Sequence, residues 1–330
     1  MRIVKKMDKV LVTGAGGFIG SHLVESLVKQ GRDVKVLLRY NSKNNWGWLE
    51  QSPIIKEIEI VTGDIRDYDL LNSSLKDCDE VFHLAALIGI PYSYLSPLAY
   101  IRTNIEGTYN VLEASRLNNL RKVIITSTSE TYGSARYVPI DESHPIVGQS
   151  PYSASKIAAD QLALSYYNSF NLPIKIVRPF NTYGPRQSAR AFIPSVITQL
   201  ISGQKGIKTG NLFPTRDYTY VQDTVAGIIA IADSDKLFGE ITNIGTNTEI
   251  SMRELLNIIM SLLNININIS EEEKRIRPSK SEVNRLICNN KKILTHTTWR
   301  PQYTLLEGLE KTIEFIKTHQ KYYKNEIYNI

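Results

Sequence analysis

The sequence predicts an α/β protein, in which a doubly wound parallel sheet is joined to a smaller α/β C-terminal domain. Two observations predict this class. Over the first 180 residues, short β-branched runs alternate with segments of helical periodicity, and a glycine-rich turn follows the first run. The length of 330 residues suits roughly two domains, and an apolar fraction of 42% supplies a large core.

The chain is expected to begin with a strand, a glycine turn, a helix and a second strand, which together form one βαβ unit. The run KVLVTG at 9–14 is followed by helical spacing at 21–31 and then by the run DVKVLL at 33–38. This alternation continues and indicates a parallel sheet with helices on both faces. Further strands are expected at 58–64, 80–86, 122–129 and 172–180, and further helices at 69–78, 98–118 and 150–170.

After about residue 180 the segments shorten and turns multiply, which indicates a second domain. We assign 1–180 to the sheet domain and 181–330 to the second domain, with a return strand near 238–246. No flexible linker separates them, so the chain is expected to cross between them more than once. Within the second domain we expect a helix at 252–263, a strand at 264–270, a charged loop at 271–285 and a surface helix at 306–320.

Composition and charge exclude several classes of protein. There is no run of about 18 apolar residues and no secretory signal pattern, so we expect no membrane span and no export. Cys78 and Cys288 form neither a disulfide framework nor a metal site, which makes a reducing, cytoplasmic setting the default. The net charge of +6 comes without a long Lys/Arg run, so we expect no nucleic acid. Arginines that bind a phosphorylated small molecule would leave the same excess.

The turn after the first strand has the pattern of a dinucleotide site. Gly14, Gly17 and Gly20 stand in GAGGFIG, between a strand and a helix. Glycines allow the tight turn, backbone N–H groups approach a pyrophosphate, and the helix N-terminus adds a favourable dipole. A glycine-rich turn without a ligand is the alternative. We predict a Rossmann-type NAD(P) site, which includes Phe18 and Ile19.

The end of the second strand bears on the choice between NAD and NADP. An Asp or Glu about 20 residues beyond the loop would bind the 2′-hydroxyl of NAD. Arg39 stands there instead, followed by Asn41 and Ser42. Because a guanidinium suits a 2′-phosphate, NADP is favoured over NAD. An Arg39 that points into solvent is the alternative.

The ends of two further strands complete the expected cofactor site. Asp64 follows the third strand and can accept a hydrogen bond from the adenine amino group, although a surface Asp in a turn would look the same. We include its neighbour Ile65. After the fourth strand come Leu84, Ala85 and Ala86, which allow a close approach to the cofactor.

A phenol and an ammonium stand on one face of the helix expected at 150–170. Tyr152 and Lys156 are four positions apart and therefore one turn apart. A free Tyr has a pKa of about 10, and a nearby cation favours the phenolate and lowers that pKa. We predict that Tyr152 takes a proton from an alcohol while a hydride leaves the same carbon.

These motifs together resemble the extended short-chain dehydrogenase/reductases over nearly the whole chain. The matching segments are 14–20, Asp64, HLAA at 83–86, Asn104, STSE at 127–130, the Tyr152–Lys156 pair, RPFNTYGPR at 178–186 and TRDYTYVQD at 215–223. The resemblance implies that Asn104 belongs to the cofactor site. It also implies that Thr128 hydrogen-bonds the sugar 4-hydroxyl and that Lys156 holds the nicotinamide ribose.

Within that family, Thr128-Ser129-Glu130 is similar to the triplet of GDP-mannose 4,6-dehydratases. The resemblance implies oxidation at C4 of a nucleotide sugar, removal of the C5 proton by Glu130, loss of water from C6 and return of the hydride to C6. The product would be a 4-keto-6-deoxy sugar, with a tightly bound cofactor regenerated at each turnover. Ser129 is a poor acid, so Glu130 is also a candidate for protonating the leaving hydroxyl.

Four segments resemble the LegB-type enzymes, which act on nucleotide-activated N-acetylglucosamine on the way to legionaminic acid. They are NSKNNWGWLE at 41–50, IPYSY at 90–94, PIDESHP at 139–145 and GPRQSARAFIPSVITQ at 184–199. This resemblance implies UDP- or GDP-GlcNAc as the substrate.

The second domain should supply cations for the diphosphate of such a substrate. By resemblance Arg216 and Arg277 bind the diphosphate, and Asn181 contacts it or the neighbouring sugar. Arg186 is a further candidate, although each arginine could be a solvated surface charge. Pro91 and Tyr92 are expected to line the sugar pocket, and the five His show no metal-ligand spacing, so no metal is expected.

Two other readings stay open. The first is a 4-epimerase or a UDP-glucuronate decarboxylase of the same superfamily, since the decarboxylases also carry Ser/Thr-Ser-Glu. The second is a non-catalytic cofactor-sensing protein, against which intact Tyr152, Lys156 and Glu130 argue. The helices at 98–118 and 150–170 look apolar on more than one face, so a homodimer built through a four-helix bundle, as in the family, is expected.

Overall fold

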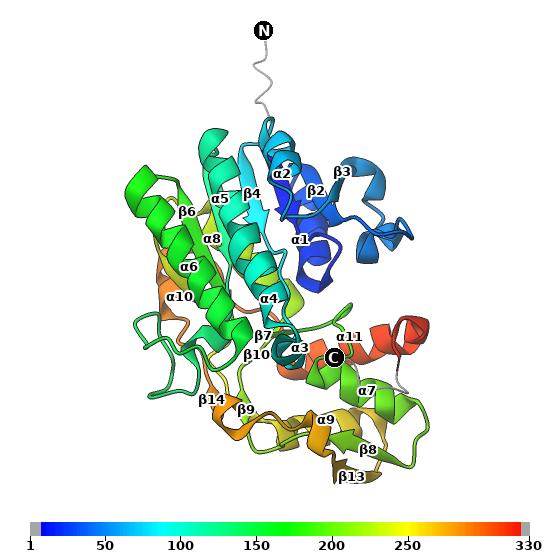
Figure 1. The fold of residues 1–330 in the computed structure, drawn as a ribbon. Coiled ribbons are helices and arrows are strands. Elements are labelled where there is room, and N and C mark those ends of the chain that lie inside the picture. Colours follow the sequence, from blue (N-terminus) through cyan, green and yellow to red (C-terminus); the bar gives the residue numbers. More distant parts are fainter. Residues whose placement is uncertain (1–7, 325–330) are drawn as a thin grey trace.

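The computed structural model describes residues 8–324. A seven-stranded sheet carries helices on both faces, and a smaller lobe with α7, α9 and α11 lies below it in Figure 1. All six strand pairings of the sheet are parallel. The structure therefore confirms the predicted fold class.

The strand order of the sheet is β11-β6-β5-β4-β1-β2-β3, so the order reverses beside β1. In such sheets ligands bind at this reversal, outside the carboxyl ends of the strands. The strands are β1 (Lys9–Thr13), β2 (Asp33–Arg39), β3 (Ile58–Gly63), β4 (Glu80–His83), β5 (Lys122–Thr126), β6 (Ile174–Pro179) and β11 (Ile241–Ile244). β11 comes from the second half of the chain and pairs with β6, so the sheet is completed late in the sequence.

Successive residues of each strand face two different cores. In β1, Val10 and Val12 belong to the core shared with α1 and α8, whereas Leu11 belongs to the core shared with α2, α5 and α6. Both faces are apolar, because a parallel sheet is covered on both sides. The covering helices are α1 (Phe18–Lys29), α2 (Tyr68–Leu75), α5 (Gly107–Leu117), α6 (Pro151–Phe170), α8 (Val221–Asp233) and, beside β11, α10 (Lys291–His296).

The helix expected at 98–118 is interrupted by a wider turn. It consists of α4 (Pro97–Tyr100), a π-helical segment at Ile101–Glu106, and α5. The π-helical segment contains Asn104, which is buried. Such segments change the direction in which side chains point and are frequent at functional sites.

The smaller lobe is built from short strands and three longer helices. Its strands are β7 (Asn181–Tyr183), β8 (Gly206–Thr209), β9 (Thr215–Arg216), β10 (Tyr218–Tyr220), β12 (Ile250–Ser251), β13 (Asn268–Glu271) and β14 (Arg285–Leu286). Its helices are α7 (Phe192–Ile201), α9 (Met252–Leu263) and α11 (Leu305–Thr318), and the short α3 (Ile90–Leu95) precedes α4. Within residues 8–324, no helix is long and apolar enough to cross a bilayer.

Two sequence-based boundaries were wrong. The strand expected at 264–270 begins only at Asn268, because α9 ends on Asn264 in the left-handed conformation with a φ of 54°. The strand expected at 80–86 ends at His83, and the three residues after it leave the sheet. His83 itself is buried, between the hydroxyls of Thr13 and Thr108 at 2.8 and 3.1 Å.

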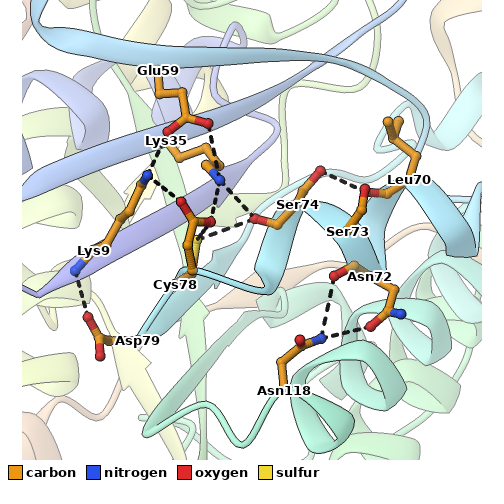
Figure 2. A network of polar contacts seen from close by, with 11 residues as sticks. Lys9, Lys35, Glu59, Leu70, Asn72, Ser73, Ser74, Cys78, Asp79 and Asn118 are labelled. Atoms are coloured by element: carbon orange, nitrogen blue, oxygen red, sulfur yellow. Dashed lines mark hydrogen bonds and ion pairs between the residues drawn. The ribbon is translucent and has the colours of Figure 1, made fainter.

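The amino ends of the strands lie at the edge of the sheet opposite to the glycine turn. This edge carries a group of charges that we call the amino-edge cluster: Lys9, Lys35, Glu59 and Asp77. Lys9 Nζ lies 2.6 Å from Glu59 and 2.5 Å from Asp77, and Lys35 Nζ lies 3.1 and 2.5 Å from the same two carboxylates. Figure 2 shows Lys9 and Lys35 beside Glu59, and the buried Cys78 nearby. Burial raises the pKa of the Cys78 thiol to about 12, so it is unreactive at neutral pH.

Candidate active site

The glycine turn after β1 is shaped by close backbone approach. Gly14 has a φ of 71°, and a Cβ there would lie 2.7 Å from the Ala85 nitrogen. A Cβ on Gly20 would lie 2.2 Å from the Gly14 oxygen. Neither position accepts a larger residue. The glycine turn therefore contacts both α1 and the residues that follow β4, Leu84 and Ala85.

The beginning of α1 has the features of a pyrophosphate site. The helix starts at Phe18 after Gly17, with no side-chain cap and no acidic residue in its first turn. Its first N–H groups and its dipole are therefore directed at the turn without a competing carboxylate. Ile19, the second helical residue, packs with Phe18 against the core. These residues fit the pyrophosphate of a dinucleotide.

The loop after β2 covers the glycine turn. The Trp48 nitrogen donates to the Gly16 oxygen at 3.0 Å. Asn41 uses its amide inside this loop, where its Nδ2 donates to the Asn45 oxygen at 2.8 Å and its Oδ1 accepts from the nitrogens of Lys43 and Asn45. Arg39 and Ser42 are exposed. The structure thus gives Asn41 a role in shaping the loop and leaves the Arg39 guanidinium at the surface.

Asp64 follows β3 and is engaged by its neighbour Arg66. The guanidinium donates to both carboxylate oxygens, at 2.9 and 2.6 Å. This pair lowers the pKa of Asp64, although partial burial opposes the shift, and the charge of Arg39 adds to it. Ile65 is buried against Gly107, and its carbonyl accepts from Asn110 at 3.0 Å. Ile65 therefore anchors the turn on α5.

Asn104 links the cofactor side of the site to the catalytic helix. Its carboxamide bonds both the nitrogen and the oxygen of Leu87, at 2.8 and 2.9 Å, and donates to the Ser155 hydroxyl at 2.9 Å. The turn that follows Ala86 is therefore fixed to α6, between Tyr152 and Lys156.

The end of β5 contacts the catalytic helix at two successive turns. Lys156 Nζ donates to the Thr126 oxygen at 2.7 Å, and the Thr128 hydroxyl makes a polar contact with the Tyr152 phenol. Tyr152 and Lys156 are 7% and 3% exposed. The helix begins in a fixed place, because Ser150 caps it and Pro151 occupies its first turn.

The ionisation of Tyr152 bears on the sequence-based expectation. Burial raises the pKa of Tyr152, the contact with Thr128 lowers it, and the charge of Glu130 raises it further. That Lys156 lowers the pKa of Tyr152 stays a prediction. The ammonium is directed to the Thr126 carbonyl, and burial lowers the pKa of Lys156 itself.

Glu130 and two arginines form a second group of charges at this edge of the sheet. Arg277 Nη1 lies 3.6 Å from Glu130, and Arg216 Nη2 lies 3.6 Å from Glu282. These distances are too long for hydrogen bonds. Among the described residues, the buried Arg277 Nη1 and Asn181 Oδ1 have no hydrogen-bond partner. Buried polar atoms without partners are costly, so the Arg277 donor is suited to an anionic ligand and the Asn181 acceptor to a hydroxyl group. Ser129 is buried beneath Glu130 in the turn Ser129–Tyr132.

Arg186 does not join this group. Its guanidinium pairs with Glu25 of α1 at 2.8 Å, because a φ of 72° directs the turn at Arg186 toward that helix. Among the described residues its buried Nη1 has no hydrogen-bond partner, and its role in substrate binding stays a prediction. Arg190, which the sequence reasoning missed, lies near Gly89 and Tyr100 instead, beside Tyr92. In α3, Pro91 is half-buried and Tyr92 is exposed.

Sequence reasoning also missed Ser127, Asp160 and Arg178, which form a buried polar group behind Lys156. Their signal was present, since Asp160 follows Lys156 by one further helical turn. Within residues 8–324, no group of three or more His, Cys, Asp or Glu side chains is placed to hold a metal.

A glycine turn at the sheet reversal, a Tyr–Lys pair on α6 and a cationic second lobe define a short-chain dehydrogenase/reductase that acts on nucleotide sugars. More specifically, the chain belongs to the GDP-mannose 4,6 dehydratase family, which it matches over residues 11–312. The family assigned from the motifs, and the assignment as an enzyme, are confirmed. The LegB-type subgroup stays a prediction.

Relatives of similar identity catalyse different reactions. A dTDP-glucose 4,6-dehydratase of Streptomyces antibioticus is 30% identical, covering 96% of this chain and 94% of that one. A UDP-N-acetyl-alpha-D-glucosaminuronate decarboxylase of Bacillus cytotoxicus is 32% identical, covering 94% of this chain and 98% of that one. The family therefore includes dehydratases and decarboxylases at comparable distance.

Two solved structures are similar over nearly the whole chain. The dTDP-glucose 4,6-dehydratase DesIV of Streptomyces venezuelae, solved with NAD bound, has a TM-score of 0.87 and 29% identity, and the match covers 96% of this chain and 99% of that one. A UDP-N-acetylglucosamine 4-epimerase of Methanobrevibacter ruminantium has a TM-score of 0.84 and 31% identity, covering 95% and 99%. Structural neighbours thus bind NAD.

Proposed function

We propose that this protein is a nucleotide-sugar 4,6-dehydratase that converts UDP- or GDP-N-acetylglucosamine to the 4-keto-6-deoxy sugar. The observation that carries the proposal is the position of Glu130. Its carboxylate is close enough to Tyr152 to raise the pKa of the phenol, and it lies 3.6 Å from Arg277. A 4-epimerase needs one base at C4, whereas dehydration needs a second base at C5.

The residues divide the reaction between them. When bound, oxidised nicotinamide accepts the hydride from C4. Tyr152 takes the proton of the 4-hydroxyl, with Thr128 beside it and Lys156 one helical turn away. The C4 ketone acidifies the C5 hydrogen, Glu130 removes it, and water leaves from C6. Return of the hydride to C6 and uptake of a proton at C5 would complete the 4-keto-6-deoxy sugar. Ser129 is buried and Glu130 is within reach of the same ring, so Glu130 also protonates the leaving hydroxyl.

Arg216 and Arg277 are proposed to bind the diphosphate. Arg216 is buried, Arg277 has a buried Nη1 without a partner among the described residues, and both reach carboxylates only at 3.6 Å, so phosphate oxygens would supply further hydrogen bonds. Asn181, whose buried Oδ1 lacks a partner, would bind the adjoining sugar. Two relatives named for N-acetylated sugars support the GlcNAc assignment, alongside the segments similar to LegB-type enzymes.

A panel of UDP-GlcNAc, GDP-GlcNAc and UDP-glucuronate, read by mass spectrometry, tests this assignment. We expect loss of one water from one or both GlcNAc nucleotides. Loss of carbon dioxide from UDP-glucuronate would show a decarboxylase, and a product of unchanged mass would show an epimerase. Either result in place of dehydration would reject the proposal.

Glu130→Gln tests the base more directly. The variant should still oxidise C4, seen as reduced nicotinamide absorbance, but should not incorporate solvent deuterium at C5. Glu282→Gln is the matched control, because it removes the carboxylate beside Arg216 instead. Deuterium exchange at the wild-type rate in Glu130→Gln would show that another group removes the C5 proton.

We further propose that the protein prefers NADP to NAD. No carboxylate stands at the end of β2, and the exposed Arg39 is close enough to lower the pKa of Asp64. The Arg39 guanidinium would form a hydrogen-bonded ion pair with a 2′-phosphate at this position. In Arg39→Ala, NADP affinity should fall more than NAD affinity; equal losses would return the choice to NAD, which the structural neighbours bind.

The oligomeric state is proposed to be a dimer through α5 and α6. Exposed apolar side chains gather on this pair and the segment before it: Leu98, Ile101, Tyr109, Leu117 and Phe170. A four-helix bundle with a second copy would cover them. Sedimentation should give twice the mass of the chain, and Ile101→Lys should give the single mass.

A reducing cytoplasmic setting stays a prediction; Cys78 and Cys288 are both free.

A further inference from the structure

The face of α6 that carries Tyr152 and Lys156 continues to Asp160 one turn later. The end of β5 meets these three positions with three consecutive residues. Thr128 contacts Tyr152, the Thr126 oxygen accepts from Lys156 at 2.7 Å, and the Ser127 hydroxyl donates to Asp160 Oδ2 at 2.6 Å. One strand end therefore fixes three successive turns of one helix.

Asp160 is bound to Arg178 of β6 in the interior of the protein. Arg178 Nη2 donates to Asp160 Oδ2 at 2.6 Å, and both side chains are at most 2% exposed. Asp160 Oδ1 has no hydrogen-bond partner among the described residues, and neither do Nε and Nη1 of Arg178. In an ion pair that only stabilises the fold, the remaining polar atoms would also form hydrogen bonds, or apolar residues could replace the pair with little loss in the free energy of unfolding.

The charges explain why a carboxylate is buried here. Lys156 and Arg178 are two buried cations on neighbouring elements, and Asp160 is the anion that acts on both. Burial lowers the pKa of Lys156, Asp160 raises it, and Arg178 lowers it. Without Asp160, Lys156 would face a buried guanidinium with no opposing charge.

We propose that Asp160 is a positioning residue, which keeps Lys156 protonated and directed toward the carbonyl of Thr126, one helical turn from Tyr152. The proposal rests on the proposed function, in which Tyr152 is the base at C4. Asp160 touches neither substrate nor cofactor and acts through Lys156. Arg178, held over the Tyr132 ring at 4.6 Å, fixes the carboxylate in turn.

Other groups that face Lys156 do not supply this charge. On β4, His83 is buried and its pKa lies at about 3, because burial disfavours the imidazolium, so it is neutral. On β6, Arg178 is a cation and opposes Lys156. On α6 itself, Tyr152 is held neutral by burial. Asp160 is therefore the group that supplies the negative charge near Lys156.

The test measures the ionisation of Lys156 in the purified protein without substrate. Lysine labelled with ¹³C at the ε-carbon is titrated by NMR, and Lys156→Met identifies the signal. In Asp160→Asn the pKa of Lys156 should fall by about one unit relative to wild type. In Asp160→Glu, which keeps the charge, it should stay near the wild-type value.

A double variant separates charge from structural damage. Asp160→Asn with Arg178→Met removes the attraction and the repulsion together, and leaves no unpaired buried guanidinium, so it should fold even where the single variant does not. Because Asp160 acts on Lys156 more strongly than Arg178 does, the pKa of Lys156 should lie below wild type and above the single variant. A value at or above wild type would overturn the proposal, as would an unchanged value in Asp160→Asn.

Turnover gives the second readout. The alkaline limb of kcat should move to lower pH by about one unit in Asp160→Asn, with KM unchanged. A loss of folding would instead appear in thermal unfolding and in the amount of bound cofactor. Failure of the sugar panel would reject the proposed reaction alone. An unaltered Lys156 titration in an enzyme that dehydrates the panel would reject the role of Asp160 alone.

Discussion

Two groups of two cations and two carboxylates lie at opposite ends of the sheet and are bonded differently. They are the amino-edge cluster and the carboxyl-edge group, which consists of Glu130, Glu282, Arg216 and Arg277. In the amino-edge cluster, each ammonium lies within hydrogen-bond distance of both carboxylates, at 2.5–3.1 Å (Figure 2). In the carboxyl-edge group, Arg277 reaches Glu130 and Arg216 reaches Glu282 only at 3.6 Å. The carboxylates Glu130 and Glu282 are each 14% exposed, whereas Glu59 and Asp77 are about half exposed.

This difference distinguishes charges that stabilise the fold from charges that are suited to binding a ligand. The amino-edge cluster satisfies its own hydrogen bonds and leaves nothing to bind. The carboxyl-edge group leaves Arg277 Nη1 without a partner among the described residues, and this atom lowers the stability of the protein until an anion binds it. Removing a side chain should therefore have opposite consequences at the two ends.

The largest expected effect is that of Tyr152→Phe. Because the phenol supplies the proton transfer at C4, turnover should fall by a factor of about 10³, the range of a lost general base. Thermal unfolding and bound cofactor should be unchanged, since the ring keeps its packing against Tyr100. Tyr137→Phe, at an exposed tyrosine, is the matched control and should keep full activity. Turnover above a tenth of wild type in Tyr152→Phe would remove the phenol from the chemistry.

Arg216→Met comes next and should separate binding from stability. The guanidinium is buried, and burial lowers its pKa, so a methionine of similar volume should raise the free energy of unfolding by about 1 kcal/mol. Substrate affinity should fall by a factor of about 10², because a desolvated partner of the diphosphate is lost. Titration calorimetry and thermal unfolding measure the two effects.

The control for Arg216→Met is Arg285→Met, at an arginine that is half exposed and pairs with Glu249 at 2.8 Å. Its removal should change stability by no more than about 0.5 kcal/mol and leave affinity unchanged. If Arg216→Met proves destabilising instead, the carboxyl-edge group contributes to the fold and the contrast between the two ends fails.

The same contrast explains what could be predicted from the sequence. The parallel sheet and the Tyr152–Lys156 pair follow from local patterns: alternating apolar runs, a glycine turn and a spacing of four. The π-helical segment around Asn104 does not, since nothing in the spacing at 98–118 announces a wider turn. The position of Arg186 was missed because a single positive φ redirects it, and such a reversal has no periodic signature.

Charge pairing was the other limit of the sequence analysis. The partners of Lys35, Glu59 and Asp77, and those of Asp160 and Arg178, are brought together only by the sheet order. Contacts between residues so far apart in the chain are fixed by topology, not by local propensity. The helical spacing from Lys156 to Asp160 can be recognised in the sequence. That Asp160 pairs with Arg178 of β6 becomes evident only from the structure.

Asp77→Asn has the smallest expected effect and tests the amino-edge cluster. Although partial burial works to raise it, the hydrogen bonds from Lys35 and Lys9 lower the pKa of Asp77 from 3.8 to about 2. A depressed carboxyl pKa stabilises the fold above the unfolded value, so the contribution is complete above about pH 4 and is lost as the pH falls through about 2. Because the carboxylate is half exposed, it contributes about 1 kcal/mol or less.

Denaturant unfolding of wild type and Asp77→Asn from pH 7 down to pH 2 measures this contribution. The variant should be less stable at pH 7, and the difference should vanish near pH 2, where Asp77 is protonated in the wild type as well. Turnover at pH 7 should be the same in both proteins, because the cluster lies at the edge of the sheet opposite to Tyr152. A difference that persists at pH 2 would mean that Asp77 acts through packing and not through charge, and a loss of turnover would mean that the two ends of the sheet are coupled.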